Sequence, residues 1–174
     1  MKKFYIFLIT LLFMLSLQSQ ASAHDLGKKK FNFGFSGSFG TGVGIIYDLL
    51  TGDEHYNVTE LNAHLALQLS PRTELQIRGG AAYYFVENSG STLGGFDDSW
   101  YFNAELSGLF YFRKNPTLWD PYMVVGSGYP KLIHLGVGNR FALSEHTSAF
   151  IETIASTWFL DYRIEARAGI SFHF

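Results

Sequence analysis

Residues 163–174, RIEARAGISFHF, place apolar and polar side chains in strict alternation. A period of two is typical of a β-strand, because successive side chains of a strand point to opposite faces. One row contains only alanine, isoleucine and phenylalanine, and the other carries three charges. The apolar row is Ile164, Ala166, Ala168, Ile170, Phe172 and Phe174; the polar row is Arg163, Glu165, Arg167, Gly169, Ser171 and His173. The fold therefore depends on what covers each face.

Seven further stretches alternate in the same way, so the sequence predicts eight strands. Tight turns are expected at 70–73 and 144–147, and a Gly/Ser/Asp-rich loop at 88–99. The facing of residues 122–129 is ambiguous, because both of their rows mix apolar residues with glycine or serine. The seven stretches are residues 31–47, 57–69, 74–85, 100–112, 122–129, 131–143 and 148–157.

The apolar rows favour strands that face lipid. They run without charge for about 9–11 residues, the length of a tilted strand that crosses a membrane. Charges such as Arg78 and Glu105 lie in the opposite row, often near its middle, and aromatic residues gather near strand ends, where membrane interfaces would lie. Long connections alternate with short ones, although those at 129–131 and 158–161 are short for external loops. A soluble lipocalin-like barrel is the alternative.

The N-terminus predicts export. Lys2 and Lys3 precede an apolar run of about 14 residues and the small-residue motif Ala21-Ser22-Ala23, typical of a signal peptide that covers residues 1–23. The alternative, a transmembrane anchor, needs about 20 apolar residues. Residues 24–174 then form one domain. The absence of cysteine excludes disulfides and thiolate metal sites, and a net charge of −2 gives no reason to expect a nucleic-acid partner.

The chain resembles the small bacterial outer-membrane β-barrels of the OmpA-barrel and OmpX type. The segments DPYMVVGSGY (120–129) and HLGVGNRFALSEHTSAFIE (134–152) are similar to the "PYxGxGxGY … GxxxRF" stretch common in that broad family. The resemblance implies an all-β fold, an eight-stranded antiparallel up-and-down transmembrane barrel in the outer membrane of a Gram-negative bacterium. Nothing in the sequence resembles the peptidoglycan-binding domain that OmpA-type proteins carry.

Charged residues of the inward rows are expected to pair with one another. The interior of an eight-stranded barrel is just wide enough to be filled by side chains, and an unpaired buried charge is costly. We predict a salt-bridged lumen that is mostly plugged; a narrow pore gated by these charges is the alternative. Small residues on the 31–47 strand leave room either for long arginines or for a small cavity. The predicted network is Arg78, Glu105, Arg140, Glu152, Arg163, Glu165 and Arg167.

No catalytic residue, cofactor or metal site is predicted. A lipid A-modifying enzyme is a second alternative, for which a Ser–His pair near outer-leaflet lipid would be needed. The three candidate pairs are Ser171/His173, His146/Ser148 and Ser70/His64. The first is expected on the inward row near the periplasmic end, far from outer-leaflet lipid, the second at a periplasmic turn, and the third lacks an evident acid at the right height. Loop groups such as His24 with Asp25, or 53–55, lack repeated metal-ligand spacing.

The remaining expectations concern partners. The acidic stretches 48–56 and 87–99 are expected to be surface loops, which suit either divalent cations beside lipopolysaccharide or plain solvation. Outer-membrane lipids and lipopolysaccharide are the expected surroundings of a monomer. Ile170, Phe172 and Phe174 resemble the C-terminal signal that barrel-assembly machinery recognises. The last strand must pair with the first, because open edges are not tolerated in hydrocarbon.

Overall fold

The computed structural model describes residues 30–44, 55–87, 99–112, 119–158 and 161–174. Eight strands account for almost all of these residues. Among the described residues, no helix is long and apolar enough to cross a lipid bilayer. The strands are β1 (Phe31–Gly44), β2 (His55–Ser70), β3 (Thr73–Glu87), β4 (Ser99–Tyr111), β5 (Trp119–Tyr129), β6 (Ile133–Ser144), β7 (Thr147–Trp158) and β8 (Asp161–His173).

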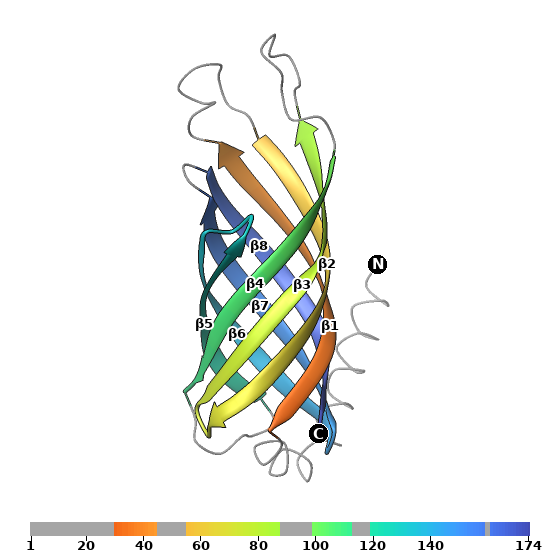
Figure 1. Ribbon diagram of the computed structural model, residues 1–174, viewed down its shortest axis with the longest axis vertical. Coiled ribbons are helices and arrows are strands. Elements are labelled where there is room, and N and C mark those ends of the chain that lie inside the picture. Colours follow the sequence, from red (N-terminus) through yellow and green to blue (C-terminus); the bar gives the residue numbers. More distant parts are fainter. Residues whose placement is uncertain (1–29, 45–54, 88–98, 113–118, 159–160) are drawn as a thin grey trace, which may run out of the picture.

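The strands form a closed barrel in sequence order, and each strand pairs antiparallel with the next (Figure 1). Closure joins β8 to β1, where Phe33 lies opposite Phe172 and Gly40 opposite Glu165. The Phe174 amide extends this seam by donating to the Phe31 carbonyl oxygen at 2.9 Å. Every strand therefore has a partner on both sides, as a wall in contact with hydrocarbon requires.

The rim of the barrel is uneven at the end opposite Phe31 and Phe174. The outermost pair between β4 and β5 joins Ala104 to Tyr129, whereas β4 begins at Ser99. The connection between β5 and β6 therefore lies well below the upper ends of β2 and β3 (Figure 1). It consists of Pro130, Lys131 and Leu132, which becomes important for the interior.

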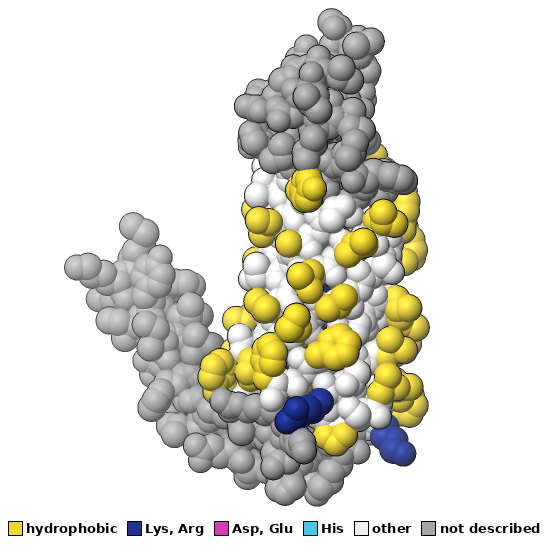
Figure 2. Space-filling view, turned by 90° about the vertical axis from the view of Figure 1, so that its left-hand side faces the viewer, with side chains coloured by type: hydrophobic (Ala, Val, Ile, Leu, Met, Phe, Trp, Pro, Cys, Tyr) yellow, Lys and Arg dark blue, Asp and Glu magenta, His cyan; other side chains and the backbone are white. Residues whose placement is uncertain are grey.

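The outer wall is apolar and uncharged. Among strand residues whose side chains the structure describes, those that face outward carry no charge. Large apolar groups are freely exposed, including Leu61 (68%), Trp100 (68%) and Phe102 (67%). Figure 2 shows hydrophobic side chains spread over one flank, with Lys and Arg gathered near its lower edge. Exposing such a large apolar surface to water is unfavourable, whereas lipid acyl chains can cover it.

The inner wall is the opposite of the outer wall, because buried residues of the barrel are mostly polar or charged. A small apolar cluster of Leu109, Tyr111, Tyr122 and Val124 lines β4 and β5. The burial of Tyr122 and Val124 also settles the facing of β5, which the sequence left ambiguous: Met123 and Val125 face outward. The hydrophobic and polar faces are thus exchanged relative to a water-soluble barrel.

The eight strands and the closed antiparallel topology confirm the fold expected from the sequence. One boundary is wrong in a way that matters: the sixth strand begins at Ile133 rather than at residue 131, because Lys131 belongs to the connection. The predicted signal peptide (1–23), residues 45–47 of the first strand and most of the two acidic loops lie outside the described residues.

Candidate functional site

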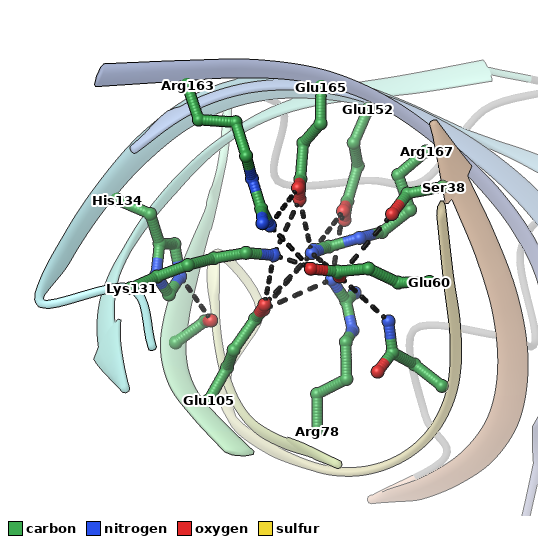
Figure 3. A network of polar contacts seen from close by, with 12 residues as sticks. Ser38, Glu60, Arg78, Glu105, Lys131, His134, Glu152, Arg163, Glu165 and Arg167 are labelled. Atoms are coloured by element: carbon green, nitrogen blue, oxygen red, sulfur yellow. Dashed lines mark hydrogen bonds and ion pairs between the residues drawn. The ribbon is translucent and has the colours of Figure 1, made fainter. Parts of the chain in front are cut away.

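A network of eight charged side chains fills the middle of the lumen (Figure 3). Four are carboxylates and four are cations, so their formal charges cancel. All are essentially buried, with side chains at most 4% exposed. The members are Glu60 on β2, Arg78 on β3, Glu105 on β4, Lys131 in the β5–β6 connection, Glu152 on β7, and Arg163, Glu165 and Arg167 on β8.

The arginines of β8 bridge carboxylates from several strands. Arg163 Nη2 lies 2.5 Å from Glu60 Oε1 and 2.5 Å from Glu165 Oε2. Arg167 Nη2 lies 2.6 Å from Glu165 Oε1 and 3.1 Å from Glu105 Oε1, and its Nη1 lies 3.2 Å from Glu152 Oε2. These contacts cross the barrel, so the network ties opposite walls together.

Each charge of the network has an opposite charge beside it, and this pairing offsets the cost of burying the charges. Taking a charge out of water costs several kcal/mol, and only good geometry with several hydrogen bonds offsets that cost. Here each carboxylate contacts at least two cations, and Glu60 also accepts hydrogen bonds from Ser38 at 3.4 Å and Asn62 at 3.2 Å. Removing one member would leave its partners buried without an opposite charge, so the network acts as a unit.

Lys131 is the one network member that does not come from a strand. Its Nζ lies 2.5 Å from Glu105 Oε1, 2.8 Å from Glu165 Oε1 and 3.0 Å from Glu60 Oε2. Figure 3 shows the side chain running from the wall to the centre of the carboxylate group. The β5–β6 connection is thereby anchored inside the barrel.

A second, smaller cluster lies nearer the end of the barrel that carries Phe31. Arg140 on β6 forms a two-pronged ion pair with Glu74 on β3, at 2.9 Å for each oxygen. The Tyr111 hydroxyl donates to Glu74 at 3.2 Å, and the Arg140 guanidinium lies 4.9 Å from the centre of the Tyr111 ring. Tyr122 joins the clusters, because its hydroxyl donates to Glu152 at 2.9 Å.

Inward glycines let large side chains lie across a neighbouring strand. Gly34 on β1 stands between His64 on β2 and Ser171 on β8, in register with both, and the His64 Nε2 and Ser171 Oγ atoms are 2.9 Å apart. An added Cβ at Gly34 would lie 2.5 Å from the His64 ring. The glycine is therefore needed for the ring to span β1 and reach β8.

The same arrangement recurs on the other side of the barrel. Gly126 on β5 is in register with Ser107 on β4 and His134 on β6, and the His134 ring spans it to reach Ser107 Oγ at 2.9 Å. Gly138 similarly separates Tyr122 from Glu152. In each case a side chain of one strand crosses the glycine of the next strand and forms a hydrogen bond with the strand beyond, so three strands are linked from the inside.

Small residues of β1 make room for other side chains than the sequence suggested. The space above Gly34 holds the His64 ring, and that above Gly40 holds Glu165. The Tyr56 ring lies over Gly42. The sequence left open whether long arginines or a small cavity occupy this space. At these three glycines a histidine, a glutamate and a tyrosine occupy it, while the arginines reach the centre of the lumen from β3 and β8.

The Ser–His pairs differ from the candidates read from the sequence. Ser171 contacts His64, rather than His173, and Ser148 contacts His173 at 2.7 Å, rather than His146. Each ring reaches a serine on another strand: His64 crosses Gly34 of β1, and His173 on β8 lies diagonally opposite Ser148 on β7. These serines and histidines are buried in the lumen. In the described residues, no group of three or more His, Asp or Glu is arranged to hold a metal ion.

The structure brings six of the seven predicted network residues into the central network. Arg140 is the exception, since it forms an ion pair with Glu74 in the second cluster. Glu60, Glu74 and Lys131 were missed. The polar rows of β2 and β3 contained the signal for the two glutamates, because both occupy inward positions. Lys131 had no such signal, since a residue in a connection has no periodicity.

The barrel is similar to solved membrane barrels. Ail, the attachment invasion locus protein of Yersinia pestis, superposes with a TM-score of 0.54 at 12% identity, covering 84% of this chain and 99% of Ail. OprG from Pseudomonas aeruginosa superposes with a TM-score of 0.49 at 11% identity, covering 84% of this chain and 97% of OprG. A de novo designed transmembrane barrel superposes with a TM-score of 0.47 at 16% identity, covering 82% of this chain and 95% of the design. No protein-family model and no curated protein matches the sequence. At these identities the likeness concerns architecture, and the chain has the fold of the small eight-stranded outer-membrane β-barrels.

Proposed function

We propose that the protein is an integral outer-membrane barrel of a Gram-negative bacterium, with a closed lumen and a structural or surface-interaction role. The observation that carries this proposal is the inverted distribution of side chains. Described outward strand positions are uncharged, whereas ten buried or part-buried charges pair inside the wall. An Arg or Lys on the lipid face at the bilayer midplane destabilises a barrel by about 2–4 kcal/mol. An outer wall without charges is therefore expected of a barrel that folds in a membrane.

The proposed closure of the lumen favours a scaffold over an open channel. Side chains of the central network meet across the barrel axis, and each is held by partners from other strands. A rigid barrel of this kind presents loops at the cell surface, which is where binding usually occurs. Lipopolysaccharide around the outer rim, and the barrel-assembly machinery during biogenesis, are its proposed partners.

Absence of catalysis is part of the proposal. Lipid A modification needs a nucleophile that outer-leaflet lipid can reach. The Ser–His contacts His64–Ser171, Ser107–His134 and Ser148–His173 all lie within the lumen. The His64 and His134 Nδ1 atoms have no hydrogen-bond partner, so no acid orients these rings as in a catalytic triad.

The test is fractionation followed by gel analysis. The protein is expected in the detergent-soluble outer-membrane fraction, and unboiled samples should migrate faster than boiled ones because the closed barrel resists unfolding in detergent. Recovery from the soluble periplasm without such a shift would refute membrane insertion. Mass spectra of lipid A from cells with and without the protein should be identical; a new acylation state would refute the non-catalytic role.

A further inference from the structure

The β5–β6 connection sends a charged side chain inward next to the buried Pro130, although Tyr129 and Leu132 on either side of these two residues are exposed. Lys131 is 2% exposed, whereas Tyr129 is 51% and Leu132 48% exposed. A lysine beside a membrane interface usually extends its ammonium towards water or lipid headgroups. Burial of this side chain therefore needs a specific interaction inside the barrel.

That interaction has the form of a complete ammonium site. A lysine ammonium has three N–H donors, and here three carboxylate oxygens accept from it: Glu60 Oε2, Glu105 Oε1 and Glu165 Oε1, at 3.0, 2.5 and 2.8 Å. The acceptors come from β2, β4 and β8. The second oxygens of Glu60 and Glu165 both bind Arg163.

The carboxylates are held independently of the connection that supplies the cation. Glu60 and Glu165 lie inside strands paired on both sides, and Glu105 is held by Arg167 at 3.1 and 3.2 Å. Lys131, in contrast, lies in a three-residue connection between β5 and β6, outside the paired strands. The site is thus built by the strands, and the connection only occupies it.

We propose that Glu60, Glu105 and Glu165 form a binding site for a small ammonium-type cation, which Lys131 fills with its own tethered ammonium. The proposal rests on the membrane barrel proposed above and adds a ligand class to its lumen. Without the lysine, the other seven network members carry one net negative charge. A free primary ammonium ion of matching shape then takes the position of Nζ.

The test is chemical rescue of Lys131→Ala in the purified full-length protein in detergent. Truncation at Cβ removes three methylenes and the nitrogen, which n-propylammonium replaces. The urea unfolding midpoint should fall on substitution, and n-propylammonium should restore more than half of the loss. Tetramethylammonium at equal concentration has no N–H donors and should restore none. Lys131→Met, which fills the space without charge, should not respond to n-propylammonium.

The outcomes separate this proposal from the one on which it rests. A Lys131→Ala midpoint equal to wild type, or equal recovery with tetramethylammonium, overturns the ammonium site while the wild-type gel shift still supports a membrane barrel. If Lys131→Ala does not fold alone, refolding yield against n-propylammonium concentration replaces the midpoint, and failure to refold at any concentration overturns the proposal. Loss of the wild-type gel shift would contradict the barrel itself.

Discussion

At the scale of single residues, inward glycines decide which side chains meet. Gly34 and Gly126 each stand in the middle of a row that begins with a histidine and ends with a serine. Any side chain at the glycine would block the ring from crossing the strand. The hydrogen bond between His134 and Ser107 thus depends on a residue that has no side chain.

Gly126→Ala should therefore destabilise the barrel. The added methyl would lie 2.5 Å from His134 Nε2 and would overlap the Leu106 carbonyl oxygen, so the expected loss is about 1–3 kcal/mol. Gly79→Ala is the matched control, because its Cβ would face outward, 3.5 Å from the nearest atom. Urea unfolding in detergent measures both, and equal midpoints for the two variants would contradict the blocking role of position 126.

At the scale of strands, the first and last strands close the barrel. Their register runs from Asn32 opposite His173 to Gly44 opposite Asp161, and the terminal Phe174 adds a backbone hydrogen bond to Phe31. The Phe174 side chain is 69% exposed on the lipid-facing row. Its aromatic ring therefore adds little to the packing of the finished barrel.

Phe174→Asp should impair assembly in cells while leaving the folded barrel nearly as stable as wild type. The reason is that the ring makes little buried contact, whereas the resemblance to an assembly signal concerns its aromatic character. The fraction of heat-modifiable protein in the outer membrane measures the effect, and Phe174→Tyr, which keeps the aromatic terminus, is the control. Normal insertion of the Asp variant would contradict the assembly role.

At the scale of the whole molecule, the central network of the lumen behaves as one formally neutral unit. Arg167 contacts four carboxylates, from β2, β4, β7 and β8, so its charge is shared across the barrel. Removing one partner from a buried ion-pair network typically costs about 3–5 kcal/mol, because the remaining charges stay buried without compensation. Water and mobile cations are the natural substitutes for a lost arginine.

In planar bilayers, the wild-type protein should therefore show little conductance, and Arg167→Met should raise it and favour cations over anions. The substitution keeps much of the side-chain volume and leaves one uncompensated carboxylate charge in the lumen. Lys30→Met, which removes an exposed charge outside the strands, is the control. Large open steps from wild-type protein would contradict the closed lumen and favour the pore alternative.

The sequence alone determined the number of strands and the separation of apolar from polar rows, because alternation with a period of two depends only on the backbone. The antiparallel closure was expected from the resemblance to outer-membrane barrels and from the need to pair every strand edge in lipid. The sequence also placed most of the charged row inside. The sequence did not show which inward charges form ion pairs, because Glu60, Glu105 and Glu165 come together from strands far apart in the chain. Lys131 shows the limit most clearly. A connection shows no alternation of apolar and polar residues, so the inward direction of the Lys131 ammonium could be seen only in the closed barrel.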